Sequence, residues 1–357
     1  MTRLHARAVL DYPFSAPACD GSVVEVAPGI LWARMPMPMA LDHINVYLLR
    51  GDDGWTLIDT GLNTQAARDC WEHIAATHLQ GLPIARLVCT HMHYDHAGLA
   101  HWLCERFGIP LYMTHGEYFM MRTLAEPVPH PLPSAQEVFY ARSGMPPERT
   151  ERMWKAMRAD PFMPPQPQSF HRLRGGDDIT LGSRTWRVVI GEGHSPEHAC
   201  LYCAQDEILI AGDQLLPRIS SNVLVTSIEP EANPLQLWLE SLTRLERLAP
   251  GTLVLPSHER VFRGLHPRTQ ELREHHGQQL GQLRDHLAEH GTCTAFDAML
   301  CLFPRLRSPV DDMLALGESI AHLSWLRYGG VLQRVLDEDG MHRFQRADST
   351  PVLNAGG

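Results

Sequence analysis

The stretch THMHYDHAG, residues 90–98, places three histidines and an aspartate within six positions. Neutral imidazole and carboxylate groups are the side chains with which proteins bind zinc and related divalent ions. Side chains two residues apart in an extended segment point the same way, so His91 and His93 could bind one ion together. Asp95 and His96 lie where the chain turns into a helix, and they could bind a second ion. The stretch therefore predicts a metal centre.

Three further apolar segments each end in a residue that can bind a metal ion. The segments TWRVVIGEGH, EILIAGD and TLVLPSH end at His194, Asp213 and His258. Strands that carry functional side chains in the loops at one edge of a sheet are a common way to build a site. A single one of these histidines would be better explained as an ordinary core or surface residue. Because metal-binding residues follow four separate strands, we predict that all of them form one centre.

The segments around these residues alternate between strand and helix patterns, which is typical of a layered α/β domain. Two short strands surround Pro28-Gly29, and a hairpin turns at residues 51–54. Strands return after residue 177, and each histidine or aspartate named above follows one of them. Helices are predicted at residues 63–80, 98–107 and about 234–248.

Residues 115–170 interrupt this alternation and are rich in methionine, proline and aromatic residues, with helices predicted at 134–143 and 147–158. Seven of the chain's 15 methionines lie between residues 113 and 163, and methionine suits adaptable apolar pockets. We therefore predict a helical lid that covers the metals and receives an apolar acyl group. Helix core or a homodimer interface is the alternative. The stretch RMPMPMALDH, residues 34–43, could form another wall of the same pocket.

The pattern changes after residue 265, which predicts a metal-binding domain over residues 22–265 and a second domain over 266–345. Three helices, at 268–290, 294–303 and 310–327, precede a hairpin, as in a small winged-helix-like domain. Its mixed charges favour packing or dimerisation over nucleic-acid binding. Residues 1–21 and 346–357 are predicted to be tails.

The composition excludes several other classes of protein. The net charge of −10 disfavours nucleic acid as a partner, because binding its backbone requires lysine and arginine to neutralise phosphates. No apolar run is long enough to span a membrane. The first 21 residues lack the apolar region of a signal peptide, so we expect a cytoplasmic protein.

In chain order, T-H-x-H-x-D-H, G-H-S-P-x-H, A-G-D and a late S-H resemble the pattern of the metallo-β-lactamase superfamily. Within that family the chain is most similar to glyoxalase II-type and LACTB-type hydrolases. The resemblance implies an α/β fold, an αββα sandwich with a small, mostly helical C-terminal domain. It also implies three sets of metal-binding residues: His91, His93 and His194 for one zinc ion, Asp95, His96 and His258 for the other, and Asp213 as a bridge.

Two further positions bear on this resemblance. Asp59, in LIDTG, follows a strand, and the family carries an aspartate there, which implies an acceptor that fixes the tautomer of a ligand histidine. A turn aspartate that caps its own loop is the alternative. Glu197 stands where the family's common G-H-T-P-G-H has a turn glycine, a change that keeps His194 and reshapes the adjacent loop.

These features predict a dinuclear zinc hydrolase, with iron or manganese as other metals, that acts on an acyl ester or thioester. Two ions that share a water lower its pKa, and the metal-bound hydroxide, oriented by Asp95, would attack the substrate. Oxygen-reducing di-iron relatives carry a carboxylate at the position of His93, so histidine there favours hydrolysis, with a mono-iron dioxygenase still open. A lactonase, a phosphodiesterase or ribonuclease, and a non-enzymatic sensor that binds an acyl ligand also stay open.

Overall fold

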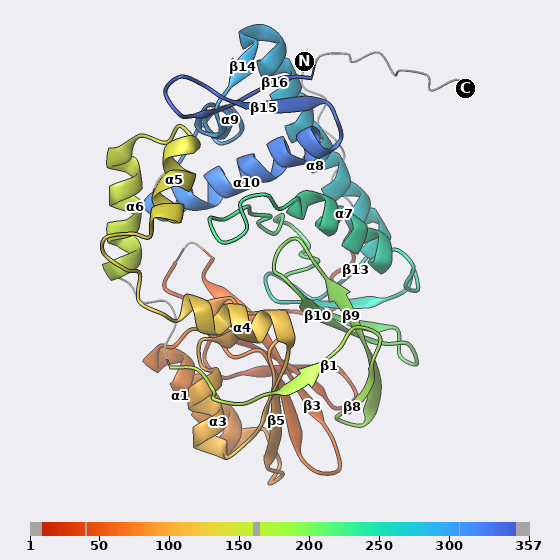
Figure 1. Ribbon diagram of the computed structural model, residues 1–357. Coiled ribbons are helices and arrows are strands. Elements are labelled where there is room, and N and C mark those ends of the chain that lie inside the picture. The colour runs from red at the N-terminus through yellow and green to blue at the C-terminus, as the bar shows by residue number, and fades with distance from the viewer. Residues whose placement is uncertain (1–8, 40, 160–164, 307, 348–357) are drawn as a thin grey trace, which may run out of the picture. The chain divides into compact units, whose positions relative to one another are not determined.

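The apolar segments of the sequence fold as two β-sheets in the first of two units (Figure 1). The computed structural model describes residues 9–347 except residue 40, residues 160–164 and residue 307. Most of the tail predicted at 346–357, and the start of the tail predicted at 1–21, therefore lie outside the described residues. The first unit takes its residues from Met1–Pro127, Asp160–Ser221 and Leu237–Arg273, and the second from Val128–Ala159, Asn222–Gln236 and Glu274–Gly357.

The first sheet has seven strands, which pair in chain order. They are β1 (Val23–Ala27), β2 (Ile30–Pro36), β3 (His43–Arg50), β4 (Trp55–Ile58), β5 (Ile84–Val88), β6 (Leu111–Thr114) and β7 (His171–Leu173). Strands β1 to β4 pair antiparallel, whereas β4 to β7 pair parallel. The carboxyl ends of β4, β5 and β6 therefore lie at one edge of this sheet.

The second sheet has six strands in the order β13-β12-β11-β10-β9-β8. They are β8 (Asp178–Leu181), β9 (Arg184–Gly191), β10 (His198–Cys203), β11 (Ile208–Gly212), β12 (Leu253–Pro256) and β13 (Phe262–Arg263). Strand β11 is parallel to β12, and the other neighbours are antiparallel. Strands β9, β11 and β12 therefore run in one direction and end at one edge.

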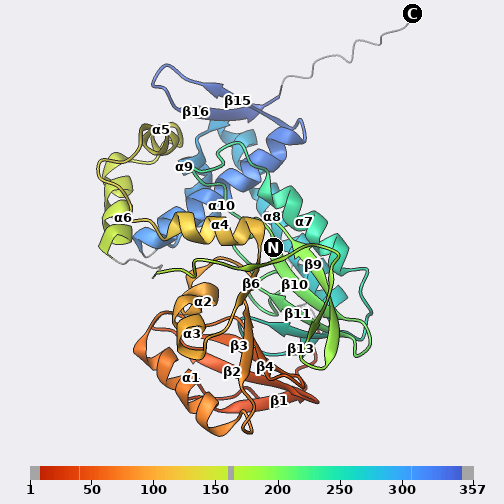
Figure 2. The same ribbon diagram turned by 60° about the horizontal axis from the view of Figure 1, so that its bottom comes forward.

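Apolar side chains from both sheets fill the space between them. Trp32 and Tyr47 of the first sheet belong to the same buried cluster as Trp186 and Leu255 of the second. Burial of such large side chains is the main favourable contribution to the stability of a layered fold. The chain thus forms the face-to-face pair of sheets that the family resemblance implies (Figure 2).

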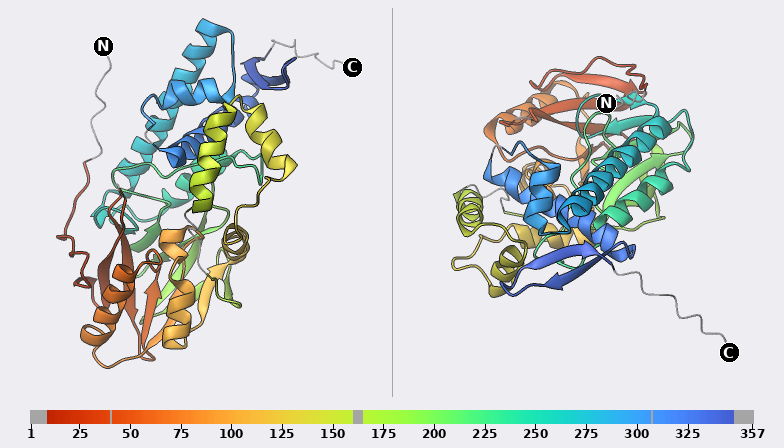
Figure 3. Two further views of the ribbon diagram at one scale, coloured as in Figure 1. Left: turned by 90° about the vertical axis from the view of Figure 1, so that its left-hand side faces the viewer. Right: turned by 90° about the horizontal axis from the view of Figure 1, so that it is seen from above.

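Helices cover the outer faces of both sheets in the first unit. They are α1 (Gln65–Thr77), α2 (Tyr94–Ala97), α3 (Ala100–Phe107), α4 (His115–Leu124), α7 (Pro234–Leu245) and the start of α8 (Leu265–His290). Trp71 of α1 and Leu103 of α3 pack on the first sheet, and Arg244 of α7 donates to the carbonyl of Ile190 in β9. Helices α7 and α8 lie side by side (Figure 3), which completes the predicted αββα sandwich.

The second unit consists mostly of helices and contains a three-stranded sheet in the order β14-β16-β15. Its elements are α5 (Ser134–Arg142), α6 (Pro147–Ala159), the end of α8, α9 (Ala295–Leu302), α10 (Pro309–Tyr328), β14 (Thr292–Cys293), β15 (Leu332–Leu336) and β16 (His342–Arg346). The predicted helices and the hairpin are present. Among the described helices of either unit, none has the length and apolar composition needed to cross a membrane.

Helices α5 and α6 belong to this second unit, although the sequence assigned residues 115–170 to the metal-binding domain. Arg149 of α6 forms an ion pair with Asp312 of α10, with 3.0 Å between Nε and Oδ2. The backbone N–H of Phe296 in α9 donates to the carbonyl of Ser143, just after α5. These contacts explain why the two helices pack with the C-terminal elements.

Several methionines and aromatic residues of the predicted lid are core residues. Met113 and Met121 are buried in the first unit, whereas Met153 is buried in the second. Trp154 is only 6% exposed and packs edge-on against Tyr140, with 5.4 Å between the ring centroids. The lid stays a prediction for the more exposed side chains of residues 115–159, and Phe162 and Met163 lie outside the described residues.

Candidate metal centre

All seven metal-binding residues predicted from the sequence converge in the first unit, at the carboxyl ends of the strands. They are His91 and His93 after β5, Asp95 and His96 in α2, His194 after β9, Asp213 after β11 and His258 after β12. Two backbone hydrogen bonds join the sheets near these strand ends. Ala199 donates to the carbonyl of Thr90 at 2.8 Å, and Asn45 donates to that of Ser257 at 2.6 Å. The parallel strands and these links together determine where the side chains meet.

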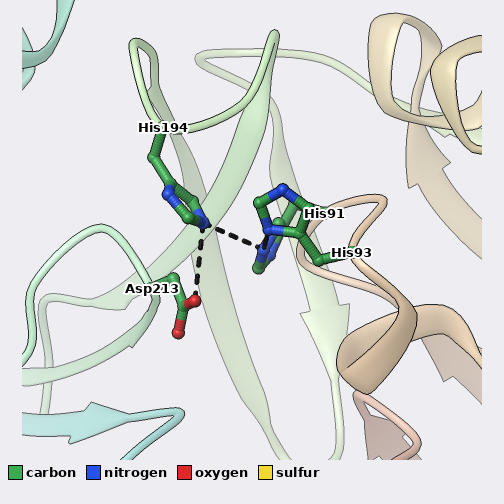
Figure 4. A group of neighbouring side chains, drawn as sticks. All are labelled: His91, His93, His194 and Asp213. Atoms are coloured by element: carbon green, nitrogen blue, oxygen red, sulfur yellow. Dashed lines mark hydrogen bonds and ion pairs between the residues drawn. The ribbon is translucent and has the colours of Figure 1, made fainter. Parts of the chain in front are cut away.

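The first group of side chains comprises His91, His93, His194 and Asp213, whose ligand atoms all lie within 4.8 Å of one another (Figure 4). Nε2 of His91 lies 2.8 Å from Nδ1 of His93 and 3.2 Å from Nε2 of His194. Three imidazole nitrogens this close together match the ligand arrangement of a zinc site. The structure thus brings together the three histidines that the sequence assigned to one ion.

The second group comprises Asp95, His96 and His258, whose ligand atoms also lie within 4.8 Å of one another. Oδ2 of Asp95 lies 3.3 Å from Nε2 of His258. Asp213 lies within reach of both groups, because its Oδ2 is 3.4 Å from Nε2 of His194 and 3.5 Å from Nε2 of His96. This position is compatible with the bridging role predicted for Asp213, and the role itself stays a prediction.

The carboxylates give the centre a strong preference for positive charge. Burial lowers the pKa of His258, but Asp213 and Asp95 outweigh burial and raise that pKa to about 10. Burial also lowers the pKa of His96, and Asp95, Asp213 and Asp59 together raise it well above its usual value. At His93, burial and the neighbouring His194 lower the pKa to about 3, so its ring is neutral. The centre thus combines neutral imidazoles with a negative field that attracts cations.

Two buried atoms at the centre show that the residues fit metal ions. In the part of the chain that the structure describes, neither Nε2 of His96 nor Oδ1 of Asp213 makes a hydrogen bond. Their contacts are ion pairs, of 3.5 Å from Nε2 to Asp213 and of 3.4 Å from Oδ1 to His258. Buried polar atoms are nearly always paired, and an unpaired one requires an explanation such as a bound ion. Nitrogen and oxygen donors of this kind are those that zinc and neighbouring divalent metals take. The two clusters are therefore able to bind metal ions.

Asp59 contacts the centre through His96, and its predicted role behind a metal ligand stays a prediction. Its Oδ2 accepts a hydrogen bond from Nδ1 of His96 at 2.9 Å, and its Oδ1 accepts one from the backbone N–H of Thr90 at 2.7 Å. The bond holds the ring so that Nε2 points toward Asp95 and Asp213. Asp59 adopts a left-handed φ of 61°, which is unusual for a residue other than glycine.

Two other histidines support the centre, and neither was predicted from the sequence to do so. Nδ1 of His258 donates to the carbonyl of His43 at 3.0 Å, which leaves Nε2 of His258 facing Asp95. Nε2 of His198 accepts a hydrogen bond from the backbone N–H of Asp213 at 3.1 Å. This approach requires glycine at position 212, where a Cβ would lie 2.3 Å from the His198 ring.

Glu117 on α4 joins the two loops that carry the first group, and the sequence did not identify it. Its buried carboxylate accepts hydrogen bonds from the backbone N–H of Met92 at 2.9 Å, from that of Glu197 at 2.7 Å and from the hydroxyl of Ser195 at 2.6 Å. Burial raises the pKa of Glu117 to about 6. An acidic residue on the buried face of a helix could have identified Glu117 from the sequence, but helix α4 itself was not predicted.

Glu197, which replaces a turn glycine, also contacts α4. Its Oε2 accepts a hydrogen bond from the backbone N–H of Gly116 at 2.7 Å, in the first turn of the helix. A carboxylate at a helix N-terminus is favourable, because it accepts from an otherwise unpaired N–H and lies at the positive end of the helix dipole. The departure from the family pattern therefore adds a second link between α4 and the loop of His194.

Comparison with known proteins connects this arrangement to one family. The model of the metallo-beta-lactamase superfamily matches residues 39–258, and that of the metallo-beta-lactamase-like C-terminal domain matches residues 280–347. The structure of a beta-lactamase domain protein from Burkholderia ambifaria is similar at 44% identity, with a TM-score of 0.83 over 95% of this chain and 99% of that chain. A metallo-beta-lactamase family protein from Thermus thermophilus is 31% identical, with a TM-score of 0.75 over 90% of this chain and 100% of that chain.

Two curated proteins are similar at lower identity. The probable metallo-hydrolase YqjP of Bacillus subtilis is 28% identical over 305 residues, which are 83% of this chain and 92% of that protein. The acyl-coenzyme A thioesterase MBLAC2 of Gallus gallus is 25% identical over 247 residues, 66% of this chain and 81% of that protein.

The links made by Glu117 lead to a prediction about metal affinity. Glu117→Ala leaves two N–H groups and a hydroxyl without their acceptor, so we expect a loss of stability of about 1–3 kcal/mol and a metal affinity lowered roughly 10- to 100-fold. Glu117→Gln, which keeps one acceptor oxygen, should restore part of both. Urea unfolding and competition with a metal chelator measure the two effects. Glu105→Ala, at an exposed position of α3, is the control, and equal behaviour of the two alanine variants would contradict the role given to Glu117.

Proposed function

Because the chain belongs to the metallo-beta-lactamase superfamily, we propose that it is a dinuclear zinc-dependent hydrolase that cleaves an acyl ester or thioester. The observation that carries the proposal is the convergence of five histidines and two aspartates in two adjoining groups. A protein that only bound an acyl ligand would not need a complete set of this kind. The similarity to a probable metallo-hydrolase supports metal-dependent hydrolysis as the reaction class.

Divalent ions bound to these residues would lower the pKa of a water molecule and polarise the carbonyl oxygen of the substrate. His91, His93 and His194 would hold one ion, and Asp213 lies where it can reach both. Asp95 contacts His96 and His258 through Oδ2. Its Oδ1 can therefore accept a hydrogen bond from the attacking water and orient it toward the substrate.

Two observations support an acyl group as the part of the substrate that the protein recognises. MBLAC2 of Gallus gallus, which this chain resembles, is named an acyl-coenzyme A thioesterase. Met39 and Ile219 are each 40% exposed, and both lie in chain segments connected to the centre. The loop of Met39 leads into His43, whose carbonyl holds His258, and Ile219 lies between Asp213 and Ser221, whose hydroxyl donates to the carbonyl of Asp213. Exposed apolar side chains beside a polar centre suit an acyl chain.

A panel of substrates tests the proposal directly. The zinc-loaded protein is assayed against acyl-coenzyme A, acyl-glutathione, lactone and RNA substrates. Turnover of acyl thioesters or esters is the expected result. Turnover of lactones alone would instead identify a lactonase, and turnover of RNA alone would identify a ribonuclease. Tight binding of an acyl ligand without hydrolysis of any substrate would overturn the enzymatic proposal.

The two-ion centre predicts the metal content of single variants. His194→Ala removes a residue of the first group and His258→Ala one of the second, so each should lower the content by about one ion per chain. Asp213→Ala should weaken binding in both groups. Elemental analysis after zinc loading and dialysis measures the loss, with Asp178→Ala as a control that removes an exposed carboxylate. If the double variant His194→Ala/His258→Ala loses no more than one ion, the two-ion model is wrong.

The role of Asp95 predicts a separation of kcat from KM. At matched metal occupancy, Asp95→Asn should lower kcat roughly 10²-fold or more with a smaller change in KM, because an orienting acceptor acts mainly in the transition state. Asp59→Asn should lower kcat less, since Asp59 acts through His96 and Thr90 rather than on the attacking water. Steady-state kinetics on the substrate found in the panel compares the two. A fully metallated Asp95→Asn variant that turns over like the wild type would contradict the mechanism.

The apolar residue in the loop before His43 predicts a dependence on acyl-chain length. Met39→Ser should raise KM for long acyl substrates several-fold, because about 0.8 kcal/mol is lost for each CH₂ group no longer buried. KM for short acyl substrates and the metal content should stay the same. Leu237→Ser is a matched control, since Leu237 is 39% exposed on α7 and Met39 is 40% exposed. An equal rise for short and long chains would show that Met39 does not contact the chain.

A further inference from the structure

The second unit contains a cluster of metal-binding side chains that the proposed hydrolase reaction does not use. We propose that His276, Glu318 and His322 form an additional site for one divalent transition-metal ion. His276 lies on α8, and the other two lie four residues apart on α10, one turn of the helix. All three belong to the second unit, so the site is separate in the fold from the centre at residues 91–258.

The positions of the donor atoms are already close to those that a bound ion requires. One ligand atom from each residue lies within 4.8 Å of the other two. Nδ1 of His276 lies 3.0 Å from Nε2 of His322. Two nitrogens bound to one tetrahedral zinc ion at 2.0–2.1 Å lie about 3.3 Å apart. A shift of a few tenths of an ångström, with the proton of His276 moved from Nδ1 to Nε2, would therefore convert the contact between the rings into a pair of metal ligands.

The tautomer of His322 is the one that metal binding needs. Its Nδ1 donates to the carbonyl of Glu318 at 2.8 Å, one turn earlier on α10. Nε2, the atom that faces His276, therefore carries the lone pair when the ring is neutral. Both rings are fully buried, which disfavours their charged forms.

A buried carboxylate and a buried amide complete the cluster. Glu318 and Gln279 are each only 7% exposed, and the Gln279 side chain hydrogen-bonds to the Glu318 carboxylate. Within the described residues, Oε1 of Gln279 has no hydrogen-bond partner. Burying an amide oxygen without a partner is unfavourable, and a cation, or a water bound to one, would supply that partner. Two imidazoles and a carboxylate form a known ligand set for zinc, with a fourth position for this oxygen or for water.

The alternative is a polar core that only packs α8 against α10. Another pair of histidines, on α8 alone, must be distinguished from the cluster when metal ions are added. His286 and His290 lie four residues apart, nearer the surface, and their rings stack at 4.3 Å between centroids. Any test must therefore separate the buried cluster from this pair and from the centre in the first unit.

The test uses the full-length protein with Co²⁺ as the probe, since Co²⁺ takes zinc sites and its visible absorption reports the geometry of its ligands. The parent variant is Asp213→Ala, which weakens the centre in the first unit. Glu318→Gln and His322→Gln are each added separately to this parent variant. His290→Gln, added to the same parent, is the matched control. Bound ions per chain, the absorption spectrum and the ion-induced rise in Tm are measured, and circular dichroism verifies folding.

Glu318→Gln and His322→Gln should each remove about one ion per chain, lower the affinity for Co²⁺ at least 10-fold and abolish its absorption band at this site. His290→Gln should change none of these. The wild type should bind about one Co²⁺ ion more than the number of ions that the double variant His194→Ala/His258→Ala loses. A Co²⁺ count unchanged by both cluster variants overturns the proposal, as does an ion lost with His290→Gln. If the cluster variants do not fold, the number of Co²⁺ ions bound by the wild type is the test. The absence of the additional ion from the wild type then overturns the proposed site.

Discussion

The carboxylates of Asp95 and Asp213 are buried among imidazole rings, and the rest of the first unit depends on how this negative charge is balanced. Removing a carboxylate from water is costly unless a positive charge or several donors compensate for it. The raised pKa values of His96 and His258 express the same demand for positive charge. Metal ions would meet that demand and supply the reactivity of a hydrolase, so stability and function rest on one interaction.

A metal-binding side chain is useful only if its orientation is fixed, and this fold fixes several of the seven side chains or their loops through a further residue. Asp59 holds His96, the carbonyl of His43 holds His258, and Glu117 holds the two loops of the first group. The left-handed backbone of Asp59 is unfavourable by itself. The hydrogen bonds that its carboxylate accepts compensate for this conformation, which explains why the strain lies next to the centre rather than elsewhere.

The convergence of the seven side chains could be predicted from the sequence because each follows an apolar strand, a pattern that is local in the chain. The layered α/β domain followed from the alternation of strand and helix patterns, and the αββα sandwich from the resemblance to the family. Glu117 could not be predicted, because its three donors lie 25 to 80 residues away and its helix lies in a segment without clear periodicity. The assignment of α5 and α6 to the second unit could not be predicted from the sequence either. It depends on pairs such as Arg149 and Asp312, which lie 163 residues apart in the chain.

Histidine and carboxylate side chains cluster in both units, and the exposure of the ligands distinguishes what each cluster can do. In the first unit His93 is partly exposed, and Asp95 and His194 each keep 9% of their surface exposed. A substrate can therefore approach that centre. In the second unit His276 and His322 are fully buried between two long helices. An ion held there could not meet a substrate without local opening, and it would instead fix α8 against α10. We therefore expect the first centre to be reactive and the proposed second site to be structural.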